Sequence, residues 1–227
     1  GRAAAGISHD LNQPLMAIRS FAENGAAFLD RDKPDRAADN LLRISDMARR
    51  MGRIIKNLRA FARQESVPVG RVDLARVLET AVELTASQLR RDGVTLEVTA
   101  PPGPLWVRGG EVRLGQVFVN LITNAVSFCE DGDAIRVWAR QRENRVLVVV
   151  EDTGPGIPEQ ALGKVFKRFY SERPEGQFGN NSGLGLAISK QIVEAHGGVI
   201  WAENIRPTAA DITSEPLGAR FVVGLPL

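Results

Sequence analysis

The chain has 227 residues, 44% of them hydrophobic and 25% charged, which is the composition of a soluble globular protein with one large domain or two modest ones. Its 29 basic and 27 acidic side chains nearly cancel, and a formal net charge of +2 excludes a polycation built to bind nucleic acid. No apolar run reaches the roughly 20 residues that a membrane span needs, and the single cysteine, Cys129, excludes an intrachain disulfide.

The first 66 residues predict a helical hairpin. Residues 2–66 contain three Gly and two Pro and carry 12 basic against 8 acidic side chains. Two apolar series with intervals of three and four are separated by turn residues at 32–35. They are Ile7, Leu11, Leu15, Ile18, Ala22, Ala26 and Leu29, then Leu41, Ile44, Ala48, Met51, Ile55, Leu58 and Ala62. Two such helices bury too little area to be stable alone, so we expect two hairpins to form a dimeric four-helix bundle.

Residues 67–72 are a predicted linker, and residues 73–227 predict an α/β two-layer sandwich. We expect helices at 74–91, 111–128 and 184–196, and strands at 94–99, 134–140, 146–151, 199–202 and 219–225. Long loops rich in Gly, Pro and Asn at 152–158, 173–185 and 206–218 are where we expect functional residues.

His9 is the side chain of the first predicted helix best suited to chemistry. Two residues of helix rotate it about 200° from the apolar Ile7, so it is expected to face solvent. A neutral, exposed imidazole is a competent nucleophile, and the adjacent Asp10 could orient it by accepting the proton of the other ring nitrogen. Taken alone, the motif favours a surface histidine without a catalytic role.

Two patterns in the second part suggest a nucleotide site. Asn120 and Asn124 lie one turn apart on an otherwise apolar helix, and their amides could hold hydrated Mg²⁺ and phosphate oxygens. Asp152 ends a buried strand and is followed by Gly154 and Gly156, an arrangement that suits an amino-bearing ring such as adenine.

A third pattern, Gly183-Leu184-Gly185-Leu186, precedes a predicted helix, whose N-terminal N–H groups could bind phosphate. Each of these three patterns could alone be an ordinary turn or a polar helix face. Together with His9, Asp10, Phe166 and Phe169 they occur in the order and spacing of sensor histidine kinases, which the whole chain resembles. The resemblance implies a dimerisation and phosphoacceptor hairpin followed by the ATP-binding domain shared with gyrase, MutL and the ninety-kilodalton heat-shock chaperones, the GHKL or Bergerat-type fold.

The resemblance also implies catalytic roles. His9 would take the γ-phosphoryl group of ATP on its ε nitrogen, with Asp10 as base or orienting group. The group would then pass to an aspartate of a response-regulator receiver domain docked near His9. Gln13 stands four residues after His9, where related kinases often have Thr or Asn, and it predicts phosphatase activity toward the regulator.

For the nucleotide, the resemblance implies ATP with Mg²⁺, and Asn120 as the metal ligand. Residues from about 170 to 182 would form a lid anchored by Phe166 and Phe169. The other implied nucleotide-binding residues are Asn124, Asp152, Gly154, Gly156, Ile157, Phe169, Tyr170, Gly183, Leu184, Gly185 and Leu186.

The chain departs from the family pattern in two further respects. Ser127 replaces a basic residue that often contacts phosphate, and the substitutes would be Lys167, Arg168 or Arg173. The segment around His9 is similar to C4-dicarboxylate and oxygen-sensor kinases, whereas the C-terminal half is more similar to envelope- and acid-sensing kinases of α-proteobacteria. The chain is therefore either a mosaic branch or a fusion joined between residues 120 and 126.

Two alternatives remain from other functional classes. A GHKL-type ATPase clamp would need a water-activating Glu at position 120, where this chain has Asn120. A non-catalytic nucleotide-binding scaffold would not need an intact His9. The preferred reading is the cytoplasmic part of a bacterial kinase that forms a homodimer, binds no nucleic acid and reaches the inner membrane only through an absent N-terminal sensor region.

Overall fold

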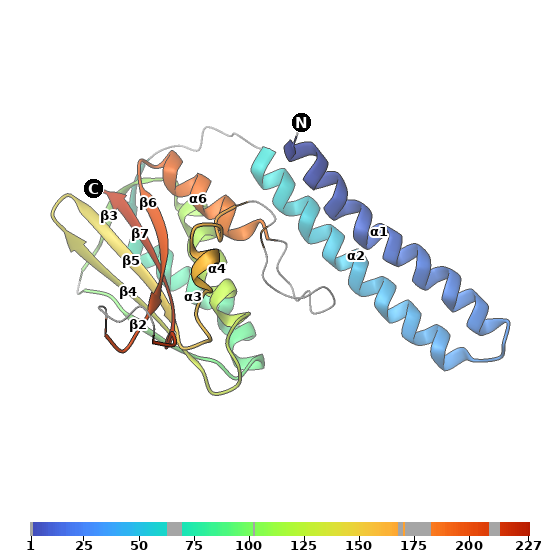
Figure 1. Cartoon of the computed structure of the whole chain (residues 1–227). Helices are drawn as coiled ribbons and strands as arrows, with labels where there is room; N and C mark the ends of the chain where they lie inside the picture. Colours follow the sequence, from blue (N-terminus) through green and yellow to red (C-terminus); the bar gives the residue numbers. More distant parts are fainter. Residues whose placement is uncertain (1, 63–69, 102, 168–169, 171–182, 209–213) are drawn as a thin grey trace. The chain divides into compact units, whose positions relative to one another are not determined.

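Figure 1 shows the computed structural model, which describes residues 2–62, 70–101, 103–167, 170, 183–208 and 214–227. In the first two helices it describes the side chains of residues 12–49, 51–52 and 55. The chain forms two compact units, Gly1–Gln64 and Glu65–Leu227, which are described separately.

The first unit is a hairpin of two long helices, α1 (Arg2–Leu29) and α2 (Pro34–Ala62). Pro34 occupies the first position of α2, where its missing N–H costs no helical hydrogen bond. Ala37 and Asn40 are buried in the hairpin, and a Cβ added to Gly25 would lie 3.6 Å from the Asn40 Cβ. Small side chains therefore bring the two helices close together, and the predicted hairpin is confirmed.

The hairpin buries none of the described members of the two apolar series. Leu15, Leu29, Leu41 and Ile55 are 53%, 60%, 65% and 41% exposed. The intervals of three and four therefore mark an apolar face that the single hairpin leaves uncovered.

The second unit contains a five-stranded sheet with the order β2-β4-β5-β7-β6. Only the β2–β4 pair is parallel. Helices α3, α4 and α6 cover one face of the sheet (Figure 1), and a separate two-stranded sheet pairs β1 with β3. The strands are β1 (Gly70–Asp73), β2 (Thr95–Thr99), β3 (Trp106–Gly109), β4 (Ala134–Arg142), β5 (Arg145–Asp152), β6 (Val199–Ile205) and β7 (Gly218–Pro226). The helices are α3 (Leu74–Arg91), α4 (Glu111–Val126), the short α5 (Glu159–Leu162) and α6 (Gly185–Ala195).

The core lies between the helices and the sheet, and α4 is its central element. Leu114, Phe118, Leu121 and Ile122 on α4 are fully buried. Burial of each such side chain stabilises the fold by roughly 1.5 to 3 kcal/mol. Helix α4 also packs against both α3 and α6, so the polar Asn120 and Asn124 lie on a helix that its neighbours hold in place.

A row of alternating charges crosses the sheet one residue before Asp152. The ladder aligns Glu97, Arg136, Glu151, Arg220 and Glu203 across all five strands. The Arg220 guanidinium bonds Glu151 at 2.6 Å and Glu203 at 2.9 Å. Opposite charges that face each other across strands favour this register, which fixes where β5 ends.

The sandwich predicted from the sequence is confirmed, with differences at its edges. Strands β1 and β3 and the short α5 were not expected, and residues 70–72 form part of β1 where the sequence predicts the end of a linker. Four-residue strands contain too few alternating positions to stand out from a loop. Among the described residues, no helix is both long enough and apolar enough to cross a bilayer.

Candidate active site

Asp152 is a buried carboxylate at the end of β5. The residue is only 5% exposed. Its Oδ1 accepts hydrogen bonds from the backbone N–H groups of Gly154 and Ala219, both at 3.1 Å. Burial raises the pKa of this carboxyl, the Asp133 charge adds to the shift, and the two backbone hydrogen bonds oppose it. With both fold contacts on Oδ1, the second oxygen is the one suited to accept a hydrogen bond from a ligand.

Two glycines let the backbone close around Asp152. A Cβ on Gly218, where φ is +149°, would lie 1.8 Å from the Asp152 carbonyl oxygen. A Cβ on Gly156, where φ is +77°, would lie 2.5 Å from the Pro216 Cβ. Any side chain at either position would displace the loop that follows β5.

Asn120 joins α4 to the first turn of α6. Its Nδ2 donates to the Gly185 carbonyl at 3.2 Å and to the Ser189 hydroxyl at 3.3 Å. Because the amide nitrogen is engaged with α6, the Oδ1 atom of Asn120 is the group suited to a cation or a donor. Among the described residues, no cluster of three His, Cys, Asp or Glu side chains could hold a metal ion.

The start of α6 fits an anion. Leu184 is the N-cap residue, and within the described part of the chain no side chain caps the first turn, so its N–H groups are suited to a ligand or to water. Gly183 has φ +65°, which brings the chain into the helix, and Leu184 is only 5% exposed. Leu186 is half-buried in the first turn.

These groups lie along one helix. A Cβ on Gly154 would approach the Phe128 carbonyl oxygen to 3.0 Å, so the loop after β5 touches the segment that follows α4. Asn124 and Asn120 follow along α4 toward Gly185, and residues 126 and 120 lie ~9 Å apart along the helix axis at 1.5 Å per residue. The arrangement suits a ligand with an amino-bearing ring at one end and phosphates at the other.

Several predicted site residues lie partly or wholly outside the residues that the structure describes. His9 and Asp10 are in helix α1, but their side chains are not described. Gln13 is exposed on α1, and Tyr170 is half-buried. The positions outside the described residues are Arg168, Phe169, Arg173 and the remainder of the predicted lid at 171–182.

The segment after α4 clarifies two residues singled out in the sequence. The Ser127 hydroxyl donates to the Asn124 carbonyl at 2.7 Å, so Ser127 contributes to the helix end. Burial raises the pKa of the Cys129 thiol to about 12, and the charges of Asp152 and Asp133 add to the shift. Cys129 is therefore a protonated packing residue at neutral pH. Lys167 is described and exposed.

Sequence patterns did not single out Asn204 as a residue of the site. Its Oδ1 accepts from the Ile157 N–H at 2.7 Å and its Nδ2 donates to the Ile157 carbonyl at 2.7 Å. The two residues are 47 positions apart, so no local pattern could have predicted their contact.

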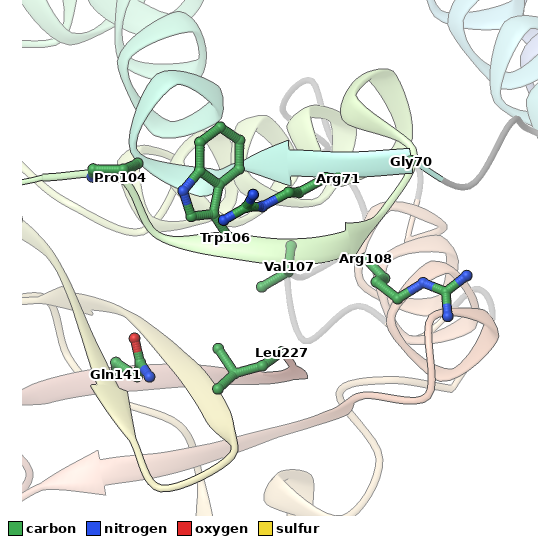
Figure 2. Close-up of a pocket in the computed structure, with 8 residues that line it drawn as sticks. All are labelled: Gly70, Arg71, Pro104, Trp106, Val107, Arg108, Gln141 and Leu227. Carbon is green, nitrogen blue, oxygen red and sulfur yellow. The ribbon is translucent and has the colours of Figure 1, made fainter.

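A separate groove lies at the two-stranded sheet (Figure 2). Its volume is about 630 Å³, and the Arg71 guanidinium lies over the Trp106 ring at 4.3 Å. None of the predicted nucleotide-binding residues lines this groove, so it is not the candidate site. Its lining residues are Gly70, Arg71, Pro104, Trp106, Val107, Arg108, Gln141 and Leu227.

The comparisons with known proteins agree with the two-unit organisation. Residues 1–67 match the His Kinase A phospho-acceptor domain. Residues 109–227, just over half of the chain, match the family described as histidine kinase-, DNA gyrase B- and HSP90-like ATPases.

Relatives match most of the chain. The C4-dicarboxylate transport sensor protein DctB of Pseudomonas aeruginosa is 39% identical over 87% of this chain and 32% of its own length. The sensor protein ChvG of Rhizobium meliloti is 39% identical over 98% of this chain and 40% of its own length. The chain thus spans about a third to two fifths of these relatives. Both alignments run through residues 120–126, so neither group of relatives is confined to one half.

A crystal structure of the histidine kinase ThkA, in complex with the response regulator protein TrrA, has the same fold. It superposes on all of this chain and 61% of its own with a TM-score of 0.77, at 23% identity. The two domain matches and the relatives confirm the family expected from the sequence, and the chain belongs to the sensor histidine kinases.

Proposed function

We propose that this chain uses ATP to phosphorylate its own His9 and passes the phosphoryl group to an aspartate of a response regulator. The observation that carries the proposal is the position of Asn120. Its amide donates a hydrogen bond to Gly185 in the first turn of α6. Asn120 itself lies on α4, and the segment just after α4 contacts the loop that follows Asp152. An adenine site, an amide for metal and phosphate, and an uncapped helix N-terminus therefore follow one another along α4.

The adenine end would be read by Asp152. The exocyclic amine of adenine donates to the carboxylate oxygen that the fold leaves open, while Gly154 and Gly156 let the ring approach the backbone. The phosphates would reach Asn124 and the N-terminus of α6. Lys167 is the described candidate for the phosphate contact that Ser127 does not supply.

Mg²⁺ fits the donor set. When bound, it would neutralise phosphate charge and align the phosphates. Asn120 would hold it through Oδ1, because Nδ2 already donates to Gly185 and Ser189. Phosphate oxygens and water would complete the coordination, which is the usual arrangement for Mg²⁺ at a nucleotide.

The transfer step needs little covalent work from the protein. The lone pair on the ε nitrogen of His9 attacks the γ-phosphorus, an N–P bond forms, and the bond to the β–γ bridging oxygen breaks as ADP leaves. The Asp10 carboxylate would accept a hydrogen bond from the Nδ1–H group of His9 and stabilise the charged ring. A carboxylate oxygen of the regulator then attacks the phosphorus, the N–P bond breaks, and neutral His9 is restored.

The assembly we propose is a homodimer that binds a receiver domain. The uncovered apolar face of the hairpin supports the dimer, because Leu15, Leu29, Leu41 and Ile55 would be buried in a four-helix bundle. The ThkA complex supports the partner class, since that kinase was crystallised with a response regulator. We further propose that a sensor region outside this sequence anchors the protein in the bacterial inner membrane.

The decisive assay uses γ-labelled ATP with Mg²⁺, followed by acid and base treatment of the labelled protein. Label that is lost in acid, survives base and disappears in His9→Gln supports the kinase. The matched control is Ser20→Ala, an exposed position on the same helix, which should label like the wild type. Label that persists in His9→Gln refutes the acceptor. Release of free phosphate without labelled protein would indicate an ATPase clamp, and nucleotide binding with neither result would indicate a scaffold.

A further inference from the structure

The loop between β5 and α5, residues 153–158, is held at both ends. At its start, the Asp152 Oδ1 accepts the Gly154 N–H at 3.1 Å. At its far end, Asn204 bonds Ile157 through both atoms of its amide, each at 2.7 Å. This loop is the backbone that an adenine ring at Asp152 would approach.

Asn204 pairs with Ile157 as a strand would. Its side-chain amide presents one acceptor to the Ile157 N–H and one donor to the Ile157 carbonyl, which reproduces the double contact of an antiparallel pair. The same Nδ2 also lies 3.2 Å from a carboxylate oxygen of Glu159. No other natural side chain of this length offers a donor and an acceptor side by side, so the contact is specific for asparagine.

The two residues that hold the loop, Asp152 and Asn204, both contact the same residue of β7. Ala219 pairs with Asn204 in the β6–β7 ladder, and its N–H donates to Asp152 Oδ1 at 3.1 Å. Between the two ends, a Cβ on Gly156 would come within 3.0 Å of Asn204 Oδ1. The spacing between the Ile157 backbone and the Asp152 carboxylate therefore depends on where β6 holds the Asn204 amide.

We propose that Asn204 is a positioning residue for the adenine end of the nucleotide site. It touches no reacting atom and acts through Ile157, by holding residues 154–157 at the distance from Asp152 that admits the ring. The inference rests on the proposed nucleotide function. It differs from a purely structural role because it predicts a change in ligand affinity in protein that is fully folded.

The test compares two ligands that share the base and differ in phosphates. Dissociation constants for adenosine and for ADP with Mg²⁺ are measured by titration, well below the unfolding temperature of each variant. Asn204→Ala removes both hydrogen bonds to Ile157 and should weaken both ligands by the same factor, about tenfold. The matched control is Asn144→Ala, an exposed asparagine in the β4–β5 turn, which should leave both constants unchanged.

The outcomes separate the two proposals. If the wild type binds neither ligand, the nucleotide site itself is refuted. If the wild type binds both and Asn204→Ala binds them with unchanged constants, the positioning role alone is refuted, whatever happens to the unfolding temperature. Weakening of ADP without adenosine would place the effect at the phosphates and would also refute it. Should Asn204→Ala fail to fold, Asn204→Asp takes its place under the same outcomes, because it keeps the acceptor for the Ile157 N–H and loses only the donor to the Ile157 carbonyl.

Discussion

His196 at the end of α6 accepts a hydrogen bond from the Gly110 N–H at 3.0 Å, while its Nδ1 lies 2.7 Å from the Ile192 carbonyl oxygen. The imidazole is therefore used at both nitrogens, as acceptor through Nε2 and as donor through Nδ1. Gly110 is the N-cap residue of α4, so this contact joins the C-terminal end of α6 to the N-terminal end of α4. Asn120 joins the same two helices nearer the other end of α6, and the pair of contacts fixes their register.

Replacing His196 should destabilise the second unit. His196→Ala leaves the Gly110 N–H without its partner and should lower the free energy of unfolding by about 1 to 3 kcal/mol. Chemical denaturation measures the loss, and Gln191→Ala, at an exposed position of the same helix, is the control. A His196→Ala protein as stable as that control would show that the contact contributes nothing to stability.

Gly218→Ala should be far more harmful than an ordinary glycine substitution. Gly218 has a φ of +149°, and the new Cβ would lie 1.8 Å from the Asp152 carbonyl oxygen. Strand β7 and the end of β5 must therefore separate. We expect a loss of about 3 kcal/mol, at the upper end of the range for a strained backbone position. Gly163→Ala is the control, because nothing lies within 4 Å of its added Cβ. Equal unfolding temperatures for the two variants would contradict the packing described around Asp152.

Nucleotide affinity should depend on the ionisation of Asp152. Burial raises the pKa of this carboxyl, and only the ionised form accepts the adenine amine without competition from its own proton. ADP should therefore bind more weakly as the pH falls, with the decline starting at a higher pH than for an ordinary aspartate. Because the folded pKa exceeds the unfolded one, the same group's contribution to stability is present at low pH and is lost as the pH rises through the folded value. Titrations of ADP across pH, with Asp152→Asn as control, test this; a wild-type curve as flat as that of Asp152→Asn would exclude it.

The uncovered face of the hairpin predicts that Leu41→Glu is monomeric. Leu41 is 65% exposed in the single hairpin, and burial of a leucine in a dimer contributes about 1.5 to 3 kcal/mol per chain. A charge at this position costs more than the lost contact, because it would be buried without a partner. Sedimentation should give a dimer for the wild type and for the exposed control Arg36→Glu, and a monomer for Leu41→Glu. A wild-type monomer, or a dimeric Leu41→Glu, would argue against the bundle.

Local patterns predicted the elements whose causes are local. Helix α3 occupies the expected range, 74–91, because Asp73 caps its first turn by accepting the Ala75 N–H and the apolar positions repeat with the helical period. The Asn120 and Asp152 motifs were likewise visible, since each is a short string of residues. The role of Asn204 was not, because its contact with Ile157 exists only after β6 has paired with β7. The sequence showed that each helix of the hairpin has an apolar face. It did not show whether that face would pack against the other helix of the same hairpin or remain exposed, as it does at Leu15 and Leu41.

Gln13 gives the last prediction. It is exposed on α1, one helical turn beyond His9, where its amide could orient a water molecule toward a phosphorylated aspartate. If the chain also dephosphorylates its regulator, Gln13→Ala should slow that reaction toward the spontaneous rate. The regulator is phosphorylated beforehand with acetyl phosphate and freed of the donor, so the measured decay does not depend on transfer from His9. Asn12→Ala, the exposed neighbour, is the control and should accelerate decay as the wild type does. Decay at the spontaneous rate with the wild type would show that the chain lacks this activity, and equal acceleration by Gln13→Ala would assign it to other residues.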